Sequence, residues 1–152
     1  DLGWVVQRHG ELYQQEYGWD QRFEGLVAEV VGAYVRELDP RRDRCWIAER
    51  GGERVGCAFV VHGDADRARL RLLLVDPAAR GAGLGQRLVE ECIAFAGQAG
   101  YAVLTLWTND VLLAARRIYE RTGFTIVRRE PHDRFGTGMV GETWERVLAG
   151  GP

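Results

Sequence analysis

Three glycines, Gly81, Gly83 and Gly85, lie between Arg80 and a stretch of helical periodicity. Backbone amides at the start of a helix, together with the helix dipole, attract an anion, and glycines let the backbone approach a bulky phosphate closely. The loop follows the apolar segment 70–75, where a strand gives way to a helix. This position suits a pyrophosphate, and a plain connection between strand and helix is the alternative interpretation.

Two common nucleotide-binding fingerprints do not match this loop. The dinucleotide fingerprint has the spacing G-x-G-x-x-G and an acidic residue roughly 20 residues further on, whereas this loop has G-x-G-x-G and no acid at that distance. The triphosphatase fingerprint requires Lys followed by Ser or Thr, and Gln86 and Arg87 occupy those positions. If the loop binds a phosphate, it belongs to another class of site.

Composition narrows the function further. The 152 residues are 46% hydrophobic, which is enough for one domain with a single core. With 20 basic and 22 acidic side chains the net charge is −2, so we expect neither nucleic acid nor a membrane to bind this segment, and a small molecule or a protein is the expected partner. All the basic residues are arginine, which excludes a lysine nucleophile or a lysine Schiff base.

Cysteine usage and the ends of the chain indicate the compartment. The three cysteines lack metal-ligand spacing and fit a reducing cytoplasm, so we expect no metal. No apolar run reaches the roughly 18 residues of a membrane span, and the N-terminus lacks the order of a signal peptide. From these features we expect the protein to be cytoplasmic. The chain begins without Met, so we also expect it to be a segment excised from a longer protein.

Periodicity predicts an α/β domain. Segment 2–7 has the pattern of a short strand and 10–17 that of a short helix, and a longer helix runs from an N-cap at Asp20 towards Pro40. Segments 45–50, 53–63 and 67–75 are predicted strands joined by tight turns. In the third of these strands three arginines alternate with apolar residues, which indicates a strand that enters from solvent and ends in a covered sheet.

The second half alternates helices and strands. Helices are predicted at 84–99, ended by Gly100, and at 111–122, capped by Asn109 and Asp110; strands are predicted at 101–108, 124–130 and 139–148. A strand, helix and strand in this order normally place the two strands parallel, which puts the glycine loop at the carboxyl end of a central strand. Residues 1–149 are expected to form one domain, and 150–152 a flexible tail.

Several motifs resemble the GNAT family of N-acetyltransferases. The segment RGAGLG, residues 80–85, is similar to that family's acetyl-CoA signature, and LLLVDPAA before it is similar to the family's fourth strand. The later segments TND and AARRIYERTGF resemble the family motif in which an Asn follows the fifth strand and a Tyr precedes Gly-Phe. More narrowly, segments 3–20, 104–110 and 135–145 resemble the acetyltransferase half of proteins fused to a MarR-type DNA-binding regulator, which implies such a domain upstream.

The resemblance implies a fold and a coenzyme site. The fold is a mixed central sheet of about six or seven strands with about four flanking helices, splayed between the family's fourth and fifth strands. The co-substrate that the resemblance implies is acetyl-CoA, and no metal is expected. The residues implied to bind it are Leu73, Val75, Arg80, Gly81, Ala82, Gly83, Leu84, Gly85 and Asn109. Ten residues separate Asn109 from Tyr119, which is about three more than the family commonly shows. Either the helix that carries Tyr119 starts later than predicted, or Asn109 is not the residue equivalent to the Asn of the family motif.

The resemblance also implies catalytic roles. Tyr119 is expected to give a proton to the departing thiolate, and an amide of the strand, that of Val75, to polarise the carbonyl. The base is open, because this strand has no Glu where many relatives have one. His132 is our candidate by its intrinsic pKa. The alternatives are Glu142, Glu145, Glu11 or Glu16, acting directly or through water.

We expect the acceptor pocket between the first helices and the last hairpin. Its aromatic wall is predicted from Tyr13, Tyr17, Trp19, Phe135 and Trp144, of which at least half can simply fill the core. The sequence therefore predicts an acetyl-CoA-dependent N-acetyltransferase acting on a small-molecule amine. The alternatives are a non-catalytic acyl-CoA or amine sensor of a fused regulator, and a nucleotide-binding domain of another kind.

Overall fold

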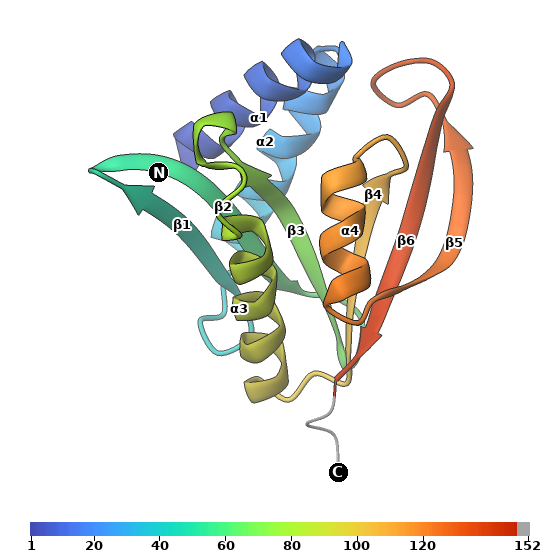
Figure 1. Ribbon diagram of the computed structural model, residues 1–152. Coiled ribbons are helices and arrows are strands. Elements are labelled where there is room, and N and C mark those ends of the chain that lie inside the picture. Colours follow the sequence, from blue (N-terminus) through green and yellow to red (C-terminus); the bar gives the residue numbers. More distant parts are fainter. Residues whose placement is uncertain (149–152) are drawn as a thin grey trace.

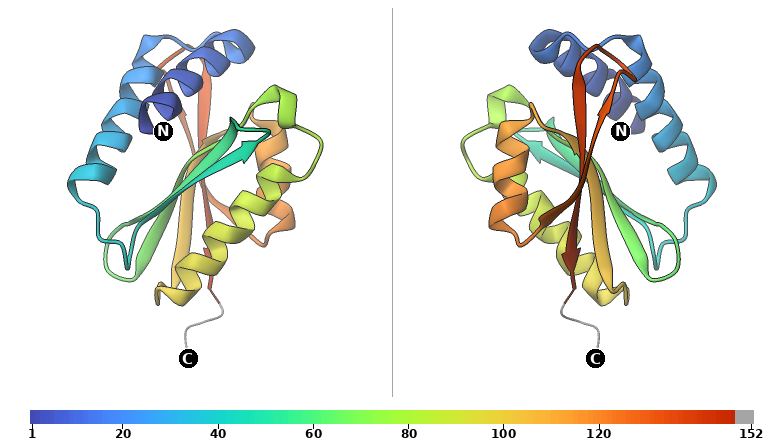
Figure 2. Two further views of the ribbon diagram at one scale, coloured as in Figure 1. Left: turned by 90° about the vertical axis from the view of Figure 1, so that its left-hand side faces the viewer. Right: turned by 90° about the vertical axis from the view of Figure 1, so that its right-hand side faces the viewer.

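A computed structural model describes residues 1–148 of the chain. The predicted tail 150–152 lies outside the described residues. Six strands form one mixed sheet in the order β1-β2-β3-β4-β6-β5. The strands are β1 (Arg44–Arg50), β2 (Glu53–His62), β3 (Arg67–Val75), β4 (Val103–Asn109), β5 (Thr125–His132) and β6 (Met139–Val147). Helices α1 (Leu2–Tyr17) and α2 (Gln21–Arg36) cover one face, and α3 (Leu84–Gln98) and α4 (Leu113–Arg121) cover the other (Figures 1 and 2).

The predicted strand at 2–7 is wrong, because these residues begin α1. Val5, His9 and Leu12 are the buried residues of this helix, and their spacing of four and three residues is helical. The local run Trp4-Val5-Val6 favours a strand by propensity, and packing against α2 and the sheet overrides that preference. The helix ends at Gly18, whose φ of 70° is the left-handed conformation of a helix C-cap.

The long helix and the hairpins are confirmed. The side chain of Asp20 accepts a hydrogen bond from the amide of Arg22 and so caps α2 at its predicted start. Strands β1, β2 and β3 are joined by the two predicted tight turns and pair antiparallel. One apolar core lies between the sheet and α3 and α4, and a second lies between the sheet and α1 and α2.

Strands β3 and β4 are parallel neighbours that separate early. They pair only from Arg67 to Arg69 on β3, opposite Val103 to Thr105 on β4, although β3 continues to Val75 and β4 to Asn109. A β-bulge bends β3 just beyond this point: its pairing with β2 shifts between Arg71 and Leu74, and Leu72 has a φ of 55°. Strand β4 stays paired with β6 along its length, so a gap opens between β3 and β4 (Figure 1).

The start of α4 differs from the prediction. The helix begins at Leu113 with Leu112 as its N-cap, so neither Asn109 nor Asp110 caps it. The amide of Leu112 instead donates to the carbonyl of Asn109 in a turn. The helix thus starts two residues later than expected, which accounts for the long spacing between Asn109 and Tyr119. Within residues 1–148 no helix combines the length and the apolar character needed to cross a lipid bilayer.

Candidate functional site

The glycine loop lines a cavity of about 410 Å³, which we call the loop cavity. Its walls are the end of β3, the loop itself, the first turn of α3, one face of α4 and the last turns of α1. Gly81 and Gly83 have φ values of 88° and 77°, which glycine adopts without steric cost. No atom lies within 4 Å of where a Cβ would stand at either position, so this side of the loop is open.

The amides of the loop are available to a ligand. Within residues 1–148 the first amide after Arg80 that donates to the backbone is that of Arg87, which bonds to the carbonyl of Gly83. The six amides of residues 81–86 therefore have no partner in the described structure. Open amides at the N-terminus of a helix of 15 residues form an anion site, so the loop fits a pyrophosphate.

Arg80 ties the loop to α1. Its guanidinium donates two hydrogen bonds to the carboxylate of Glu16, at 2.8 and 2.6 Å, and its Nε donates to the carbonyl of Val75. The hydrogen bonds raise the pKa of Arg80 and lower that of Glu16. Arg80 thus positions the loop against α1, and Glu16 is held as a charged partner. The exposed Arg117 and Arg121 of α4 line the same cavity and form no ion pair with the described residues.

The end of β3 offers an unpaired backbone edge to the loop cavity. Asp76 donates its amide to Val55 on β2, so the amide of Val75, one residue earlier, points away from β2 and towards the gap. Val75 and Leu73 both line the loop cavity. An extended ligand arm can therefore pair with this edge as a missing strand would.

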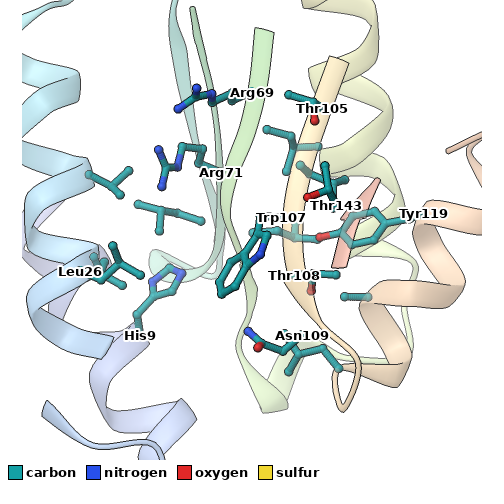
Figure 3. A pocket seen from close by; sticks show the side chains of 18 of the residues that line it. His9, Leu26, Arg69, Arg71, Thr105, Trp107, Thr108, Asn109, Tyr119 and Thr143 are labelled. Atoms are coloured by element: carbon teal, nitrogen blue, oxygen red, sulfur yellow. The ribbon is translucent and has the colours of Figure 1, made fainter. Parts of the chain in front are cut away.

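A second cavity of about 400 Å³ passes through the gap between β3 and β4, and we call it the splay cavity. It is lined from both faces of the sheet, by His9 and Leu26 on one side and by Ala115 and Tyr119 on the other (Figure 3). The two cavities share four lining residues, Tyr13, Leu73, Leu112 and Ala115. Two ligands can therefore meet at the gap.

Tyr119 lines the splay cavity from α4. Its side chain is buried and packs against Phe124 and Trp144, and its hydroxyl makes no hydrogen bond with the described residues. In Figure 3 the hydroxyl points from α4 towards β4. Burial raises the pKa of Tyr119, so its hydroxyl stays protonated and is a free proton donor.

Asn109 and His132 are brought together by the structure. The Oδ1 atom of Asn109 lies 2.7 Å from Nε2 of His132, and the amide of Arg134 donates to Nδ1 of His132. Nε2 is therefore the protonated nitrogen, and the lone pair of the ring is occupied. His132 lines neither cavity, and burial lowers its pKa. Asn109 lines the splay cavity rather than the loop cavity.

The predicted aromatic residues separate into two groups. Tyr13 and Trp19 line the splay cavity, and Tyr17 lines the loop cavity. Phe135 and Trp144 are each 1% exposed and line neither cavity. Phe135 packs on Trp19 and holds the loop after β5 against the turn between α1 and α2.

The two glutamates of β6 are held by ion pairs. The carboxylate of Glu142 is fully buried and binds Arg116, Arg129 and the indole nitrogen of Trp144. Glu145 lines the splay cavity and pairs with Arg67. Both carboxylates are therefore engaged by arginine side chains.

Sequence reasoning did not place His9 in the acceptor pocket. Its Nδ1 atom bonds to the carbonyl of Val5 at 2.8 Å and so carries the proton, which leaves the lone pair on Nε2. This Nε2 is buried without a hydrogen-bond partner, and the ring lines the splay cavity (Figure 3). Burial lowers the pKa of His9 to about 4, which keeps the ring neutral. A helical interpretation of segment 2–17 would have placed His9 on the buried face.

Two arginines and a tryptophan of the splay cavity were also missed. Arg69 and Arg71 of β3 were interpreted as a solvated strand face, and Trp107 of β4 as part of an apolar run. Trp107 lies over Gly141 of the neighbouring strand, where a Cβ would approach the indole ring to 2.7 Å. Glycine at this position lets the indole approach β6 this closely.

Within residues 1–148 no three His, Cys, Asp or Glu side chains come together as a metal site.

Comparisons with known proteins agree with this geometry. A family model described as an acetyltransferase (GNAT) domain matches residues 41–126. The chain is 34% identical over 114 residues to an uncharacterized N-acetyltransferase of Schizosaccharomyces pombe, an alignment that covers 74% of this chain and 69% of the relative. It is 31% identical over 123 residues to the N-acetylaspartate synthetase of Danio rerio, of which it spans only 42%, with 80% of this chain covered.

A solved structure supports the fold. A protein of Salmonella typhimurium, determined with its cofactor acetyl-CoA, superposes with a TM-score of 0.75 over 97% of this chain and 90% of that protein, at 19% identity. The expected mixed sheet, with four helices and a splay between neighbouring parallel strands, is thereby confirmed.

Proposed function

Because the chain belongs to the GNAT family of acetyltransferases, we propose that it transfers the acetyl group of acetyl-CoA to the amine of a small molecule in the splay cavity. One observation carries this proposal. A cavity lined by free helix-start amides and a cavity lined by polar and aromatic side chains meet at the gap between β3 and β4. Transfer between two bound molecules requires such a meeting point.

The loop cavity fits acetyl-CoA. The amides of residues 81–86 hold the pyrophosphate, and Leu73 and Val75 present their backbone to the pantetheine arm. Arg80 acts by fixing the loop to Glu16. Arg117 and Arg121 add positive charge at the far wall. When bound there, acetyl-CoA supplies an acetyl group activated as a thioester.

Residues at the gap between β3 and β4 stabilise the charge that develops during the transfer and donate a proton to the leaving group. The amide of Val75 donates towards the carbonyl oxygen and stabilises the charge that develops on it. As the amine nitrogen bonds to the acetyl carbon and the carbon–sulfur bond breaks, Tyr119 donates its proton to the sulfur. The proton lost by the amine passes through water and restores Tyr119.

The identity of the base stays a prediction. The geometry around His132 does not favour this residue as the general base, because the lone pair of its ring accepts a hydrogen bond from the amide of Arg134. Asn109 stays a proposed ligand of the pantetheine arm, although it lines the other cavity. The upstream MarR-type domain also stays a prediction. Acetylation of any amine would contradict the alternative of a sensor without turnover.

Thermal unfolding with and without acetyl-CoA tests the coenzyme site. Ligand at about 100 times its dissociation constant adds roughly 2.7 kcal/mol, which raises Tm by roughly 5 to 11 °C for a domain of this size. Gly83→Glu places an anion in the cradle and should abolish the shift. Gly52→Glu is the matched control, because Gly52 has a similar φ of 81° and open space around it in the β1–β2 turn.

Two outcomes of this experiment would overturn the proposal. The first is an unchanged Tm at saturating acetyl-CoA, and the second is an equal shift in the Gly83→Glu variant. Release of free coenzyme A thiol in the presence of a panel of amines then measures the transfer itself.

A further inference from the structure

The splay cavity contains positive charge that the described residues do not neutralise. Arg67, Arg69 and Arg71 alternate along β3, face α1 and α2, and all line the cavity. Arg67 is paired with Glu145, whereas Arg69 and Arg71 form no ion pair or hydrogen bond with any residue of 1–148. Figure 3 shows these two guanidinium groups side by side on the same side of β3. Burial and the charge of Arg69 lower the pKa of Arg71.

Nearby carboxylates do not neutralise this pair. Glu37 and Asp43 line a smaller neighbouring cavity together with the two arginines, and Asp64 lines the splay cavity. The carboxylate of Asp43 is hydrogen-bonded to the ring and the amide of His62 and to the amide of Asp39. None of these three carboxylates lies within the 4.0 Å of an ion pair with Arg69 or Arg71. Arg71 is half-buried beside the exposed Arg69, and an anion that binds between these like charges is favoured.

The same cavity holds a buried acceptor without a donor. Nε2 of His9 carries a lone pair, is fully shielded from solvent, and has no partner among the described residues. Leaving such an atom unpaired is unfavourable, so an N–H group of a ligand is the complementary partner. The cavity therefore presents two guanidinium donors and one imidazole acceptor to the same molecule.

We propose that the acetyl acceptor is an amino carboxylate, a small molecule of the amino acid type, whose carboxylate binds Arg69 and Arg71 and whose amino group donates to Nε2 of His9. The proposal rests on the proposed function, since it names the substrate class of that site. Arginine suits this role because its planar fork matches a carboxylate with two parallel hydrogen bonds. A volume of about 400 Å³ accommodates an amino acid, and Leu26 and Trp107 offer an apolar wall for its side chain.

Acetylation rates of matched amines test the anion site. The probes are the protein amino acids, the carboxamides of those that react, phenethylamine without a carboxylate, and phosphoethanolamine with a phosphate in its place. We expect an amino acid to be preferred over its carboxamide. Arg71→Gln should raise KM for that amino acid about 10- to 100-fold, the range expected for a hydrogen bond to a charged group, and leave KM for acetyl-CoA unchanged. Arg128→Gln, on the exposed face of β5, is the charge-matched control.

The His9 half of the proposal has its own pair of variants. His9→Asn keeps a donor near the carbonyl of Val5 and removes the acceptor at Nε2, whereas His9→Gln places an amide oxygen near the position of Nε2. The Gln variant should retain a lower KM for the amino acid than the Asn variant. Equal KM values in the two variants, both folded by their Tm, would remove His9 from the site.

The outcomes separate this proposal from the proposed function. Equal rates for amino acids and their carboxamides, or an unchanged preference in Arg71→Gln, would overturn the carboxylate site while acetyl transfer stands. Acetylation of phosphoethanolamine but of no amino acid would overturn the choice of carboxylate. If no amine is acetylated, the transfer function fails, and calorimetry of amino acids with the protein decides: binding that Arg71→Gln abolishes supports the site, and no binding overturns it.

Discussion

Two side chains in the splay cavity are kept neutral by burial and each has a free polar atom. The hydroxyl of Tyr119 is a donor without an acceptor, and Nε2 of His9 is an acceptor without a donor. Both reach the same cavity from opposite faces of the sheet, through the gap between β3 and β4. Because neither atom makes a hydrogen bond with the described residues, a change confined to that atom tests function more directly than stability.

Replacing Tyr119 by Phe tests the proton donor. The hydroxyl has no partner in the described structure, so its removal should leave Tm within about 2 °C of the wild type. A general acid contributes about 100-fold or more to the rate, and kcat should fall by that factor while KM for acetyl-CoA is retained. Steady-state kinetics with an identified amine measure both constants. An unchanged kcat would mean that Tyr119 only fills the core.

The pH dependence of stability tests the burial of His9. Its pKa is lowered to about 4 in the folded protein, against 6.5 in the unfolded chain, so the unfolded chain binds the extra proton between these values. The stability from neutral His9 is therefore fully present above about pH 6.5 and is lost as the pH falls towards about 4. Between about pH 7.5 and pH 5 this residue should lower the free energy of unfolding by about 2 kcal/mol.

Urea unfolding at the two pH values measures this loss, and His9→Asn isolates it. All other titratable groups are the same in both proteins, so their contribution cancels in the comparison. The difference between the wild type and the variant should therefore shrink by about 2 kcal/mol on going to pH 5. A constant difference would show that His9 titrates normally in the folded state.

At the scale of elements, the sequence predicted best where one periodicity was unbroken. The helix after Asp20, the strands with their tight turns and the helix after Gly83 were all found, because capping residues and alternating or helical patterns agree there. The first helix was misjudged because β-branched and aromatic residues at 4–6 favour a strand locally, whereas burial against α2 decides the outcome.

The residues of the candidate site also divide into those with a local signal in the sequence and those brought together only by packing. The position of the glycine loop between β3 and α3 was predictable because strand, turn and helix signals are local, and that of Tyr119 near the end of α4 because it belongs to a recognisable motif; their roles stay predictions. The splay cavity was not predictable, because Arg71 and His9 lie 62 residues apart and meet only when α1 packs over β3. The bulge at Leu72 has no signature in the sequence, yet it bends β3 where the gap opens.

At the scale of the molecule, the splayed sheet places two cavities against one shared wall. The loop cavity and the splay cavity have Tyr13, Leu73, Leu112 and Ala115 in common. Ligands in the two cavities therefore meet beside this wall. Where two ligands contact each other, each buries apolar surface of the other, which favours the binding of both.

This arrangement predicts positive coupling between coenzyme A and the amino carboxylate. Coenzyme A, which lacks the acetyl group, permits both to bind without reaction. Its dissociation constant, measured by calorimetry, should fall about 5-fold or more when the amino acid is saturating, because coupling free energies are typically about 1–3 kcal/mol. The affinity for the amino acid must rise by the same factor when coenzyme A is saturating. Arg71→Gln should abolish the effect at the same amino acid concentration, because the amino acid no longer binds. Equal dissociation constants with and without the amino acid would show that the two cavities bind independently and that the shared wall transmits nothing.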